Sequence, residues 1–279
     1  MIRFWGVAVF AIALLSSCWQ GEKGKVDEQV PLDTLPYDLL PTDTMEILIQ
    51  ETPMPKSADE LFDDFLFNFA ANRELQLRRI KFPIMIWRGE KADTLWEEDW
   101  QHDRFFLRQG YYTLILDDER QMYAMKDTAI EHVMIERIYY GTSSIQQFGF
   151  NKVDGLWHLD SLRFIPISSS PDGSFIAFYN RFATDTAFQV KSIGETVDFT
   201  SPDPGDDYNE IEGLLTPETW LAFAPELPSG TIYNIVYGNR RRGGNRKLFI
   251  IRGISNSLET RLEFCRRDSG QWVLVRLKE

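Results

Sequence analysis

The feature that most constrains the fold of this chain is an internal repeat. Three phenylalanines of an expected helix recur 113 residues later, as the pairs Phe62 and Phe175, Phe65 and Phe178, and Phe69 and Phe182. Further on, Leu-x-x-Glu-x-Trp ends at Trp100 and again at Trp220, and the order of all matches is kept. The sequence therefore predicts a duplication, with copies at 57–165 and 171–279.

Each copy is of a size that can bury one hydrophobic core, at about 109 residues. The joint between the copies, Pro166 to Gly173, is short. We therefore expect the two copies to pack as neighbours rather than to move independently.

Within a copy, helical periodicity comes first and strand-like runs follow. Apolar residues between Ala58 and Phe69 form one stripe at helical spacing, and Ser57 and Glu60 have the spacing of a capping box. Alternating, β-rich runs follow at Tyr111–Leu116, His132–Tyr140, Gln146–Lys152 and Leu156–Phe164, and at Thr231–Tyr237, Lys247–Ile254, Leu258–Arg266 and Trp272–Leu277. Helices followed by an antiparallel sheet predict an α+β fold.

The first eighteen residues have the pattern of an export signal. An apolar run from Phe4 to Leu15 is shorter than the roughly 20 residues that a membrane-spanning helix needs. It ends in Leu-Ser-Ser-Cys18, which resembles the lipobox of bacterial lipoproteins, with Cys18 as the lipidated residue. We expect residues 1–17 to be a signal peptide; an ordinary secretory signal with an incidental cysteine is the alternative.

The residues around Cys18 also predict a location. Trp19 follows the cysteine where an aspartate would direct inner-membrane retention, and this resemblance to lipoprotein sorting signals favours the outer membrane. The lipid would anchor the protein in the bacterial cell envelope, with the periplasmic or the surface face left open. Residues 18–56 hold five prolines and many acids, which predicts a semi-extended tether.

The end of each copy carries the residues of a family resemblance. Phe-x-Lys-x-Asp-Gly-x-Trp closes the first copy at Trp157, and Phe-x-Arg-x-Asp-x-Gly-x-Trp closes the second at Trp272. With the preceding helices, this pattern resembles the nuclear-transport-factor-2-like (NTF2-like), or cystatin-like, cone. With the lipobox and the duplication, the chain resembles a family of uncharacterised Bacteroides-type lipoproteins. The resemblance implies two tandem cone-type domains, each with N-terminal helices packed on a curved antiparallel sheet, and no established activity.

Composition excludes several kinds of function. The chain has 42 acidic and 30 basic residues and a net charge of −12, which argues against nucleic acid as a partner. Two cysteines exclude a disulfide framework, and the three histidines lack metal-ligand spacing. No nucleophile elbow or glycine-rich phosphate loop is present, so we predict no catalytic motif, no metal and no cofactor.

Two places in the sequence are candidates for binding. Trp100 and His102 lie in an acid-rich segment, where His102 is the best single candidate for acid–base work. Trp100 is matched by Trp220 in the other copy and is therefore by default a core residue, with a ligand platform as the alternative. Arg240, Arg241 and Arg242 form a basic run on an acidic protein. This run could bind an anionic lipid head group, a glycan acid or an acidic partner, or it could serve solubility alone.

Two functions from different classes follow. The first is a lipid-anchored envelope module that binds a small molecule, a glycan or an envelope protein without catalysis. The alternative is a cone-fold enzyme, of the isomerase, dehydratase or hydrolase type, that acts on an apolar small molecule in one of the two copies. A deep cavity within one copy that encloses an acid or histidine without a neutralising partner would favour the enzyme. Filled cavities and an exposed groove between the copies would favour the binding module.

Overall fold

The computed structural model describes residues 54–279, with the exception of residues 204, 240–241 and 255–257. These residues belong to one compact unit, Asp43–Glu279. The expected signal peptide (1–17), Cys18 and the tether as far as residue 53 lie outside the described residues. Residues 57–165 are called the first repeat below, and residues 171–279 the second repeat.

Each repeat opens with two consecutive helices. These are α2 (Phe62–Ala71) and α3 (Arg73–Arg79) in the first repeat, and α4 (Gly173–Thr184) and α5 (Thr186–Lys191) in the second. The shorter helical segments are η3 (Lys56–Asp59), η4 (Glu97–Asp99), η5 (Glu119–Lys126), η6 (Ile167–Ser169) and α6 (Trp220–Phe223).

Helix α2 begins later than the sequence predicts. The expected capping box of Ser57 and Glu60 does not start the helix, because Ser57 lies in η3 and the residue before α2 is Leu61, which makes no side-chain cap. Asp63 and Asp64 lie in the first turn instead, where carboxylates interact favourably with the helix dipole. The stripe of apolar side chains is as predicted.

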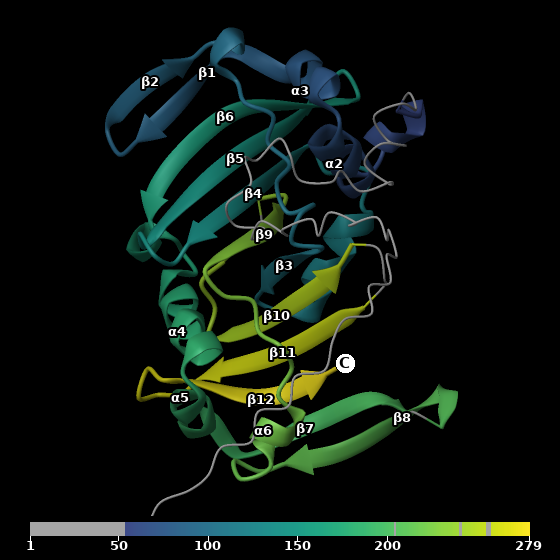
Figure 1. Ribbon diagram of the computed structural model, residues 1–279, viewed down its shortest axis with the longest axis vertical. Coiled ribbons are helices and arrows are strands. Elements are labelled where there is room, and N and C mark those ends of the chain that lie inside the picture. The colour runs from purple at the N-terminus through teal and green to yellow at the C-terminus, as the bar shows by residue number, and fades with distance from the viewer. Residues whose placement is uncertain (1–53, 204, 240–241, 255–257) are drawn as a thin grey trace, which may run out of the picture. The chain divides into compact units, whose positions relative to one another are not determined.

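The strands of the described residues form one twelve-stranded sheet (Figure 1). In chain order they are β1 (Ile80–Arg88), β2 (Lys91–Leu95), β3 (Tyr111–Leu116), β4 (His132–Tyr139), β5 (Ser144–Val153), β6 (Leu156–Pro166), β7 (Ile193–Asp203), β8 (Asp206–Leu215), β9 (Thr231–Tyr237), β10 (Arg246–Gly253), β11 (Glu259–Arg266) and β12 (Trp272–Lys278). Their order across the sheet is β2-β1-β6-β5-β4-β9-β3-β10-β11-β12-β7-β8. The sheet is curved and mostly antiparallel, with parallel pairs at β1–β6, β7–β12 and β3–β9.

The strand order shows that the repeats exchange one strand each. Strand β9 of the second repeat pairs along its whole length with β4 of the first. Strand β3 of the first repeat pairs with β10 of the second. The structure therefore does not have the predicted separate sheet in each copy. The two repeats form one sheet, and each repeat adds one strand to the half of the sheet that the other repeat forms. The sequence of the strands encodes their periodicity but not their pairing, so it could not show this exchange.

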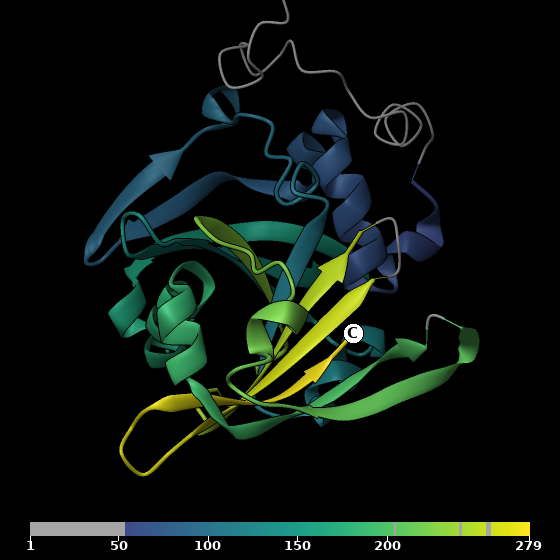
Figure 2. The same cartoon turned by 60° about the horizontal axis from the view of Figure 1, so that its bottom comes forward.

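The two strands at the centre of the sheet are buried on both faces. Leu114 and Leu116 of β3 face the helix α2 side, whereas Ile115 between them lies in the cluster around α4. Figure 2 shows the helices of the two repeats on opposite sides of the sheet. Because both faces are covered, β3 and β9 are almost continuously apolar rather than alternating.

Side chains complete the seam between β3 and β9, where the ladder is reduced to the single pair Thr113 and Asn234. The Thr113 hydroxyl donates a hydrogen bond to the carbonyl oxygen of Tyr233 at 2.9 Å, and Asn234 Oδ1 accepts one from the backbone N–H of Ile115 at 2.8 Å. Both side chains are fully buried. They satisfy backbone groups that would otherwise be left unpaired in the middle of the sheet.

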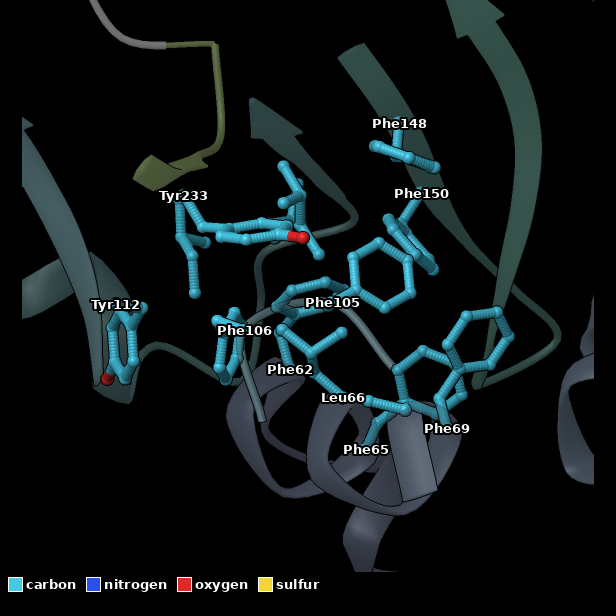
Figure 3. Packing of buried hydrophobic residues seen from close by; sticks show 14 of the residues in the cluster. Phe62, Phe65, Leu66, Phe69, Phe105, Phe106, Tyr112, Phe148, Phe150 and Tyr233 are labelled. Atoms are coloured by element: carbon cyan, nitrogen blue, oxygen red, sulfur yellow. The ribbon is translucent and has the colours of Figure 1, made fainter. Parts of the chain in front are cut away.

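The predicted phenylalanine stripe forms the core between α2 and the sheet. Phe62, Phe65 and Phe69 point toward Phe148 and Phe150 of strand β5 (Figure 3). The rings of Phe69 and Phe150 meet edge to face, with centroids 5.4 Å apart. Each such fully buried ring contributes about 1.5–3 kcal/mol relative to an exposed one.

Candidate functional site

A pocket of about 400 Å³ lies at the N-terminal end of helix α2. Its lining residues are Asp63, Phe67, Tyr112, Arg252, Gly253, Ile254 and Glu259. The first three belong to the first repeat and the other four to the second. The pocket is therefore composite, and it is complete only when the two repeats share one sheet.

Asp63 is the polar centre of this pocket. Its carboxylate accepts a short hydrogen bond from the hydroxyl of Tyr237, which the exchanged strand β9 brings from the second repeat. Tyr112 on β3 lies nearby and lowers the pKa of the same carboxyl. Among the described residues, Asp63 thus has one side-chain donor, the neutral hydroxyl of Tyr237, and no ion-pair partner.

Arg252 lies near Asp63 but is bound to other groups. Its guanidinium donates to Glu259 through Nε at 2.7 Å and through Nη2, while Nη1 contacts the sulfur of Met125 at 3.1 Å. Glu259 also accepts from Arg261 at 2.5 Å. Burial would raise the pKa of Glu259, but the hydrogen bonds from both arginines hold that pKa below its ordinary value.

The environment of Asp63 favours its protonated form. Burial raises the pKa of Asp63 above its ordinary value, against the opposing effects of the Tyr237 hydrogen bond and the Arg252 charge. Burial and the nearby Asp63 raise the pKa of Tyr112 to about 12 and place that of Tyr237 well above its ordinary value. The tyrosines therefore stay neutral donors, and Asp63 is the group that can change charge.

Asp63 is not among the site residues predicted from the sequence, although the repeat contains a signal for it. At the displacement of 113 residues, Asp63 corresponds to Ile176, which is fully buried on α4. An acid in one copy at a position that the other copy uses for its core marks a site where the copies differ in chemistry. Tyr237 gave no comparable signal, because its pairing with Asp63 depends on the strand exchange.

Arg242 forms ion pairs with carboxylates inside the protein. Its Nε donates to Asp172 at 2.7 Å, and its Nη1 and Nη2 donate to Glu136 at 3.1 and 2.8 Å. Burial opposes the charged guanidinium, yet Glu136 and Asp172 raise the pKa of Arg242 above its ordinary value. The predicted use of Arg242 for an external anion is therefore not supported, because internal carboxylates occupy its donors. Arg240 and Arg241 lie outside the described residues.

This buried ion network continues to Lys247. Lys247, 1% exposed, binds Asp117 and Asp172 through its ammonium group. Burial would raise the pKa of Asp172, but Arg242 and Lys247 hold that pKa below its ordinary value. The network thus connects three parts of the chain: Glu136 and Asp117 belong to the first repeat, Asp172 to the joint, and Arg242 and Lys247 to the second repeat.

Trp100 lies in the core rather than at a binding surface. Its ring is 6% exposed, and its indole N–H donates to Gln76 Oε1 at 2.9 Å. The second repeat has the same bond, from Trp220 to Gln189 Oε1 at 3.0 Å. The binding role predicted for Trp100 is therefore not supported. Trp100 is instead one half of a buried polar pair that occurs in both repeats.

The His102 side chain contacts the backbone at the C-terminal end of helix α2. Its Nε2 lies 2.9 Å from the carbonyl oxygen of Ala70. Asp103, one of the acids that made His102 a candidate, is bound by Arg137 at 2.6 Å. His102 does not line the Asp63 pocket.

The described residues contain no cluster of three or more histidines, cysteines or acids that could hold a metal ion. His132 bonds Asn151 at 2.8 Å, and His158 lies 3.0 Å from the carbonyl oxygen of Leu156.

In the part of the chain that the structure describes, no helix has the length and apolar character needed to cross a membrane.

The comparisons with known proteins agree with this fold. Residues 41–279 match the family described as a domain of unknown function, DUF4348. A search of curated proteins finds no match. The chain is similar to the crystal structure, at 2.15 Å resolution, of an NTF2-like protein from Bacteroides fragilis NCTC 9343. The two are 35% identical with a TM-score of 0.73, and the match covers 81% of this chain and 98% of the other. The resemblance to NTF2-like proteins is thus confirmed, and the chain belongs to the DUF4348 family.

Proposed function

We propose that this protein is a lipid-anchored, ligand-binding module of the bacterial cell envelope and that the Asp63 pocket is its binding site. The observation that carries the proposal is a partly buried carboxylate that lines a cavity and whose side-chain donor is the neutral hydroxyl of Tyr237. Such a group is costly to bury unless a further partner completes it. A ligand with a hydrogen-bond donor would supply that partner.

The composite walls of the pocket support binding rather than a purely structural role. Phe67 gives an apolar wall, while Arg252 and Asp63 place a cation and an acid within one small cavity. Ligand sites in general combine apolar walls with a few convergent polar groups. We infer that the two repeats are tandem cone-type domains whose duplication creates this site.

The anchor is the second part of the proposal. The lipobox-like segment before Cys18 and the proline-rich residues 18–56 would place the described unit at the end of a tether on the outer membrane. Labelling cells with a fatty-acid analogue tests this directly. Wild type should be labelled and Cys18→Ala should lose both the label and membrane association; unchanged labelling would contradict the anchor.

An enzyme is the second candidate, and the raised pKa of Asp63 is the observation that favours it. A carboxyl group with a raised pKa in a cavity can serve as a general base or acid nearer to neutral pH than an ordinary aspartate. Under this alternative, Asp63 would move the proton and the hydroxyl of Tyr237 would orient its carboxyl group. Turnover that is lost in Asp63→Asn while ligand binding persists would favour the enzyme.

Ligand-observed NMR with a fragment library tests the binding site. The full chain, Asp63→Asn and Asp64→Asn are compared, because Asp64 is an exposed acid on the same helix turn and gives a matched loss of charge. A set of fragments should bind wild type and Asp64→Asn but not Asp63→Asn. Identical fragment profiles for all three proteins would contradict the proposed site.

A further inference from the structure

The second repeat has its own pocket, of about 590 Å³, at the corresponding place. It lies between helix α4 and the segments around Tyr140 and Ser143, which follow strand β4 and precede β5 of the first repeat. The Asp63 pocket likewise lies between α2 and the segments that end β10 and begin β11. Each pocket is thus formed by the first helix of one repeat and a hairpin of the other.

The chemistry of the two pockets is different. None of the residues that the structure assigns to the second pocket is charged. Its polar groups are the hydroxyls of Ser143, Ser168 and Ser174 and the amide of Asn180, and Asn180 stands where the first repeat has Phe67. The acid is also missing, since Ile176 stands where the first repeat has Asp63. We refer to this as the neutral pocket.

The walls of the neutral pocket are held by close packing. A Cβ atom at Gly173 would lie 2.2 Å from the carbonyl oxygen of Ile167, so only glycine allows α4 to start this close to η6. The hydroxyl of Ser174 accepts a hydrogen bond from the indole N–H of Trp272 at 3.0 Å. The positions of these lining residues are therefore set by the core.

Tyr140 adds a largely buried side chain to this wall. Its hydroxyl is enclosed by protein atoms and has no hydrogen-bond partner among the described residues, and burial raises its pKa far enough to keep it neutral. The ring of Tyr140, rather than its hydroxyl, is therefore the part that a ligand can contact.

We propose that the neutral pocket is a second ligand site and that it takes an uncharged sugar. A sugar ring has hydroxyl groups around its edge and C–H groups on its faces. The serine hydroxyls and the Asn180 amide can exchange hydrogen bonds with the former, and Tyr140 and Ala177 can contact the latter. A charged ligand would lose hydration here without meeting an opposite charge. This site is independent of the Asp63 pocket.

Saturation-transfer NMR on the full chain tests the proposal with sugars of matched size. The probes are methyl α-D-glucopyranoside, D-glucuronate and D-glucosamine at neutral pH. We expect transfer to the glucoside. The part of each charged sugar's transfer that Ala177→Trp removes should report at least about fivefold weaker binding, because the neutral pocket offers these sugars no counter-charge, whereas the other pocket holds Asp63 and Arg252. Absence of transfer to the glucoside, or equal binding of the charged sugars at the site that Ala177→Trp removes, would overturn the proposal.

Two alanine-to-tryptophan variants locate the site. Ala177 is exposed and lines the pocket, so Ala177→Trp fills the cavity from the surface of α4. Ala187 is also exposed but lies on α5 outside the lining, and Ala187→Trp is the matched control. Transfer should disappear in Ala177→Trp and persist in both Ala187→Trp and Asp63→Asn. Transfer that survives Ala177→Trp, or that is lost in Asp63→Asn, would place the sugar elsewhere.

The hydroxyl of Tyr140 has its own test. Tyr140→Phe removes an unpaired buried hydroxyl and keeps the ring, so the melting temperature of the free protein should not fall. The affinity for the glucoside should stay within about twofold of wild type, because the enclosed hydroxyl does not face the sugar and the ring is kept. A fall of about tenfold or more would overturn this placement of the sugar.

Discussion

The hydroxyl of Tyr237 donates a hydrogen bond to the carboxylate of Asp63, a residue 174 positions earlier in the chain. Tyr237 can reach α2 only because strand β9 of the second repeat lies beside β4 of the first. The strand exchange that joins the repeats is therefore also what completes the Asp63 pocket. Folding and the candidate site depend on the same pairing.

The Asp63→Asn variant should change how stability depends on pH. Because the pKa of Asp63 is raised on folding, its contribution to stability is full below the ordinary value of 3.8 and is lost as the pH rises through the folded pKa. Asparagine carries no charge, so at pH 7 the variant should be as stable as wild type or more stable. Its advantage should vanish below pH 3.8. Urea unfolding at several pH values measures this difference.

Asp64→Asn is the control for that experiment, because Asp64 is exposed on the same turn. Because Asp64→Asn keeps Asp63, the loss of stability that Asp63 causes as the pH rises should remain in this variant. If wild type instead gained stability over Asp63→Asn as the pH rose, the pKa of Asp63 would be lowered on folding and the account of the pocket would be wrong.

Lys247→Met should destabilise the protein strongly. It leaves Asp117 and Asp172 without the cation that both of them contact in a buried site, and breaking a buried ion pair in this way typically costs about 3–5 kcal/mol. Its neighbour Arg246 has a side chain that is 63% exposed, and its ion pair is with Glu263. Arg246→Met should therefore cost no more than about 1 kcal/mol. If denaturant unfolding showed equal losses of free energy of unfolding for the two variants, the buried ion network would not be stabilising the contact between the repeats.

The two repeats should not fold separately. A fragment of residues 54–170 lacks β9 beside β4, and a fragment of residues 171–279 lacks β3 beside β10. Each would expose a long apolar edge, so neither alone should show cooperative thermal unfolding, whereas the co-expressed fragments should form one complex. Each fragment keeps its own equivalent strand, β3 or β9, so a monomeric fragment with a cooperative transition would show that a repeat can fold without the exchange.

Removing the glutamine of the glutamine–tryptophan pair should lower the free energy of unfolding by different amounts in the two repeats. Gln189→Leu leaves the Trp220 indole N–H unpaired, which should cost about 1–3 kcal/mol. Gln76→Leu should cost more, because Gln76 also bonds the backbones of Phe69 and Asp103. Denaturant unfolding of both variants gives the order, and a reversed order would contradict these roles.

The sequence predicted the central strands better than the outer ones. Strands β3 and β9 have the predicted bounds, because their apolar β-formers are buried on both faces. The outer strand β2 was not predicted, since its residues are mostly exposed and polar and give no period of two. The same holds for β8, whose sequence is acidic.

The candidate site was harder to predict, because its parts come together only through pairing between distant segments. Trp100 and His102 were chosen from a local cluster of chemistry-bearing residues, and the structure places Trp100 in the core and ties His102 to α2. Asp63 could have been found by comparing the copies position by position, since Ile176 replaces it. No local pattern indicates that Tyr237 and Arg252 lie beside it.

The charge state of Asp63 is the property on which both proposed uses of the pocket depend. It is measured most directly by following the carboxyl ¹³C resonance of Asp63 in the full chain as a function of pH, with Asp63→Asn to assign the signal. We expect a midpoint above 3.8, because burial outweighs the Tyr237 hydrogen bond and the Arg252 charge. A midpoint at or below 3.8 would show an ordinary helix-terminal acid and would contradict the assignment of this pocket as the functional site.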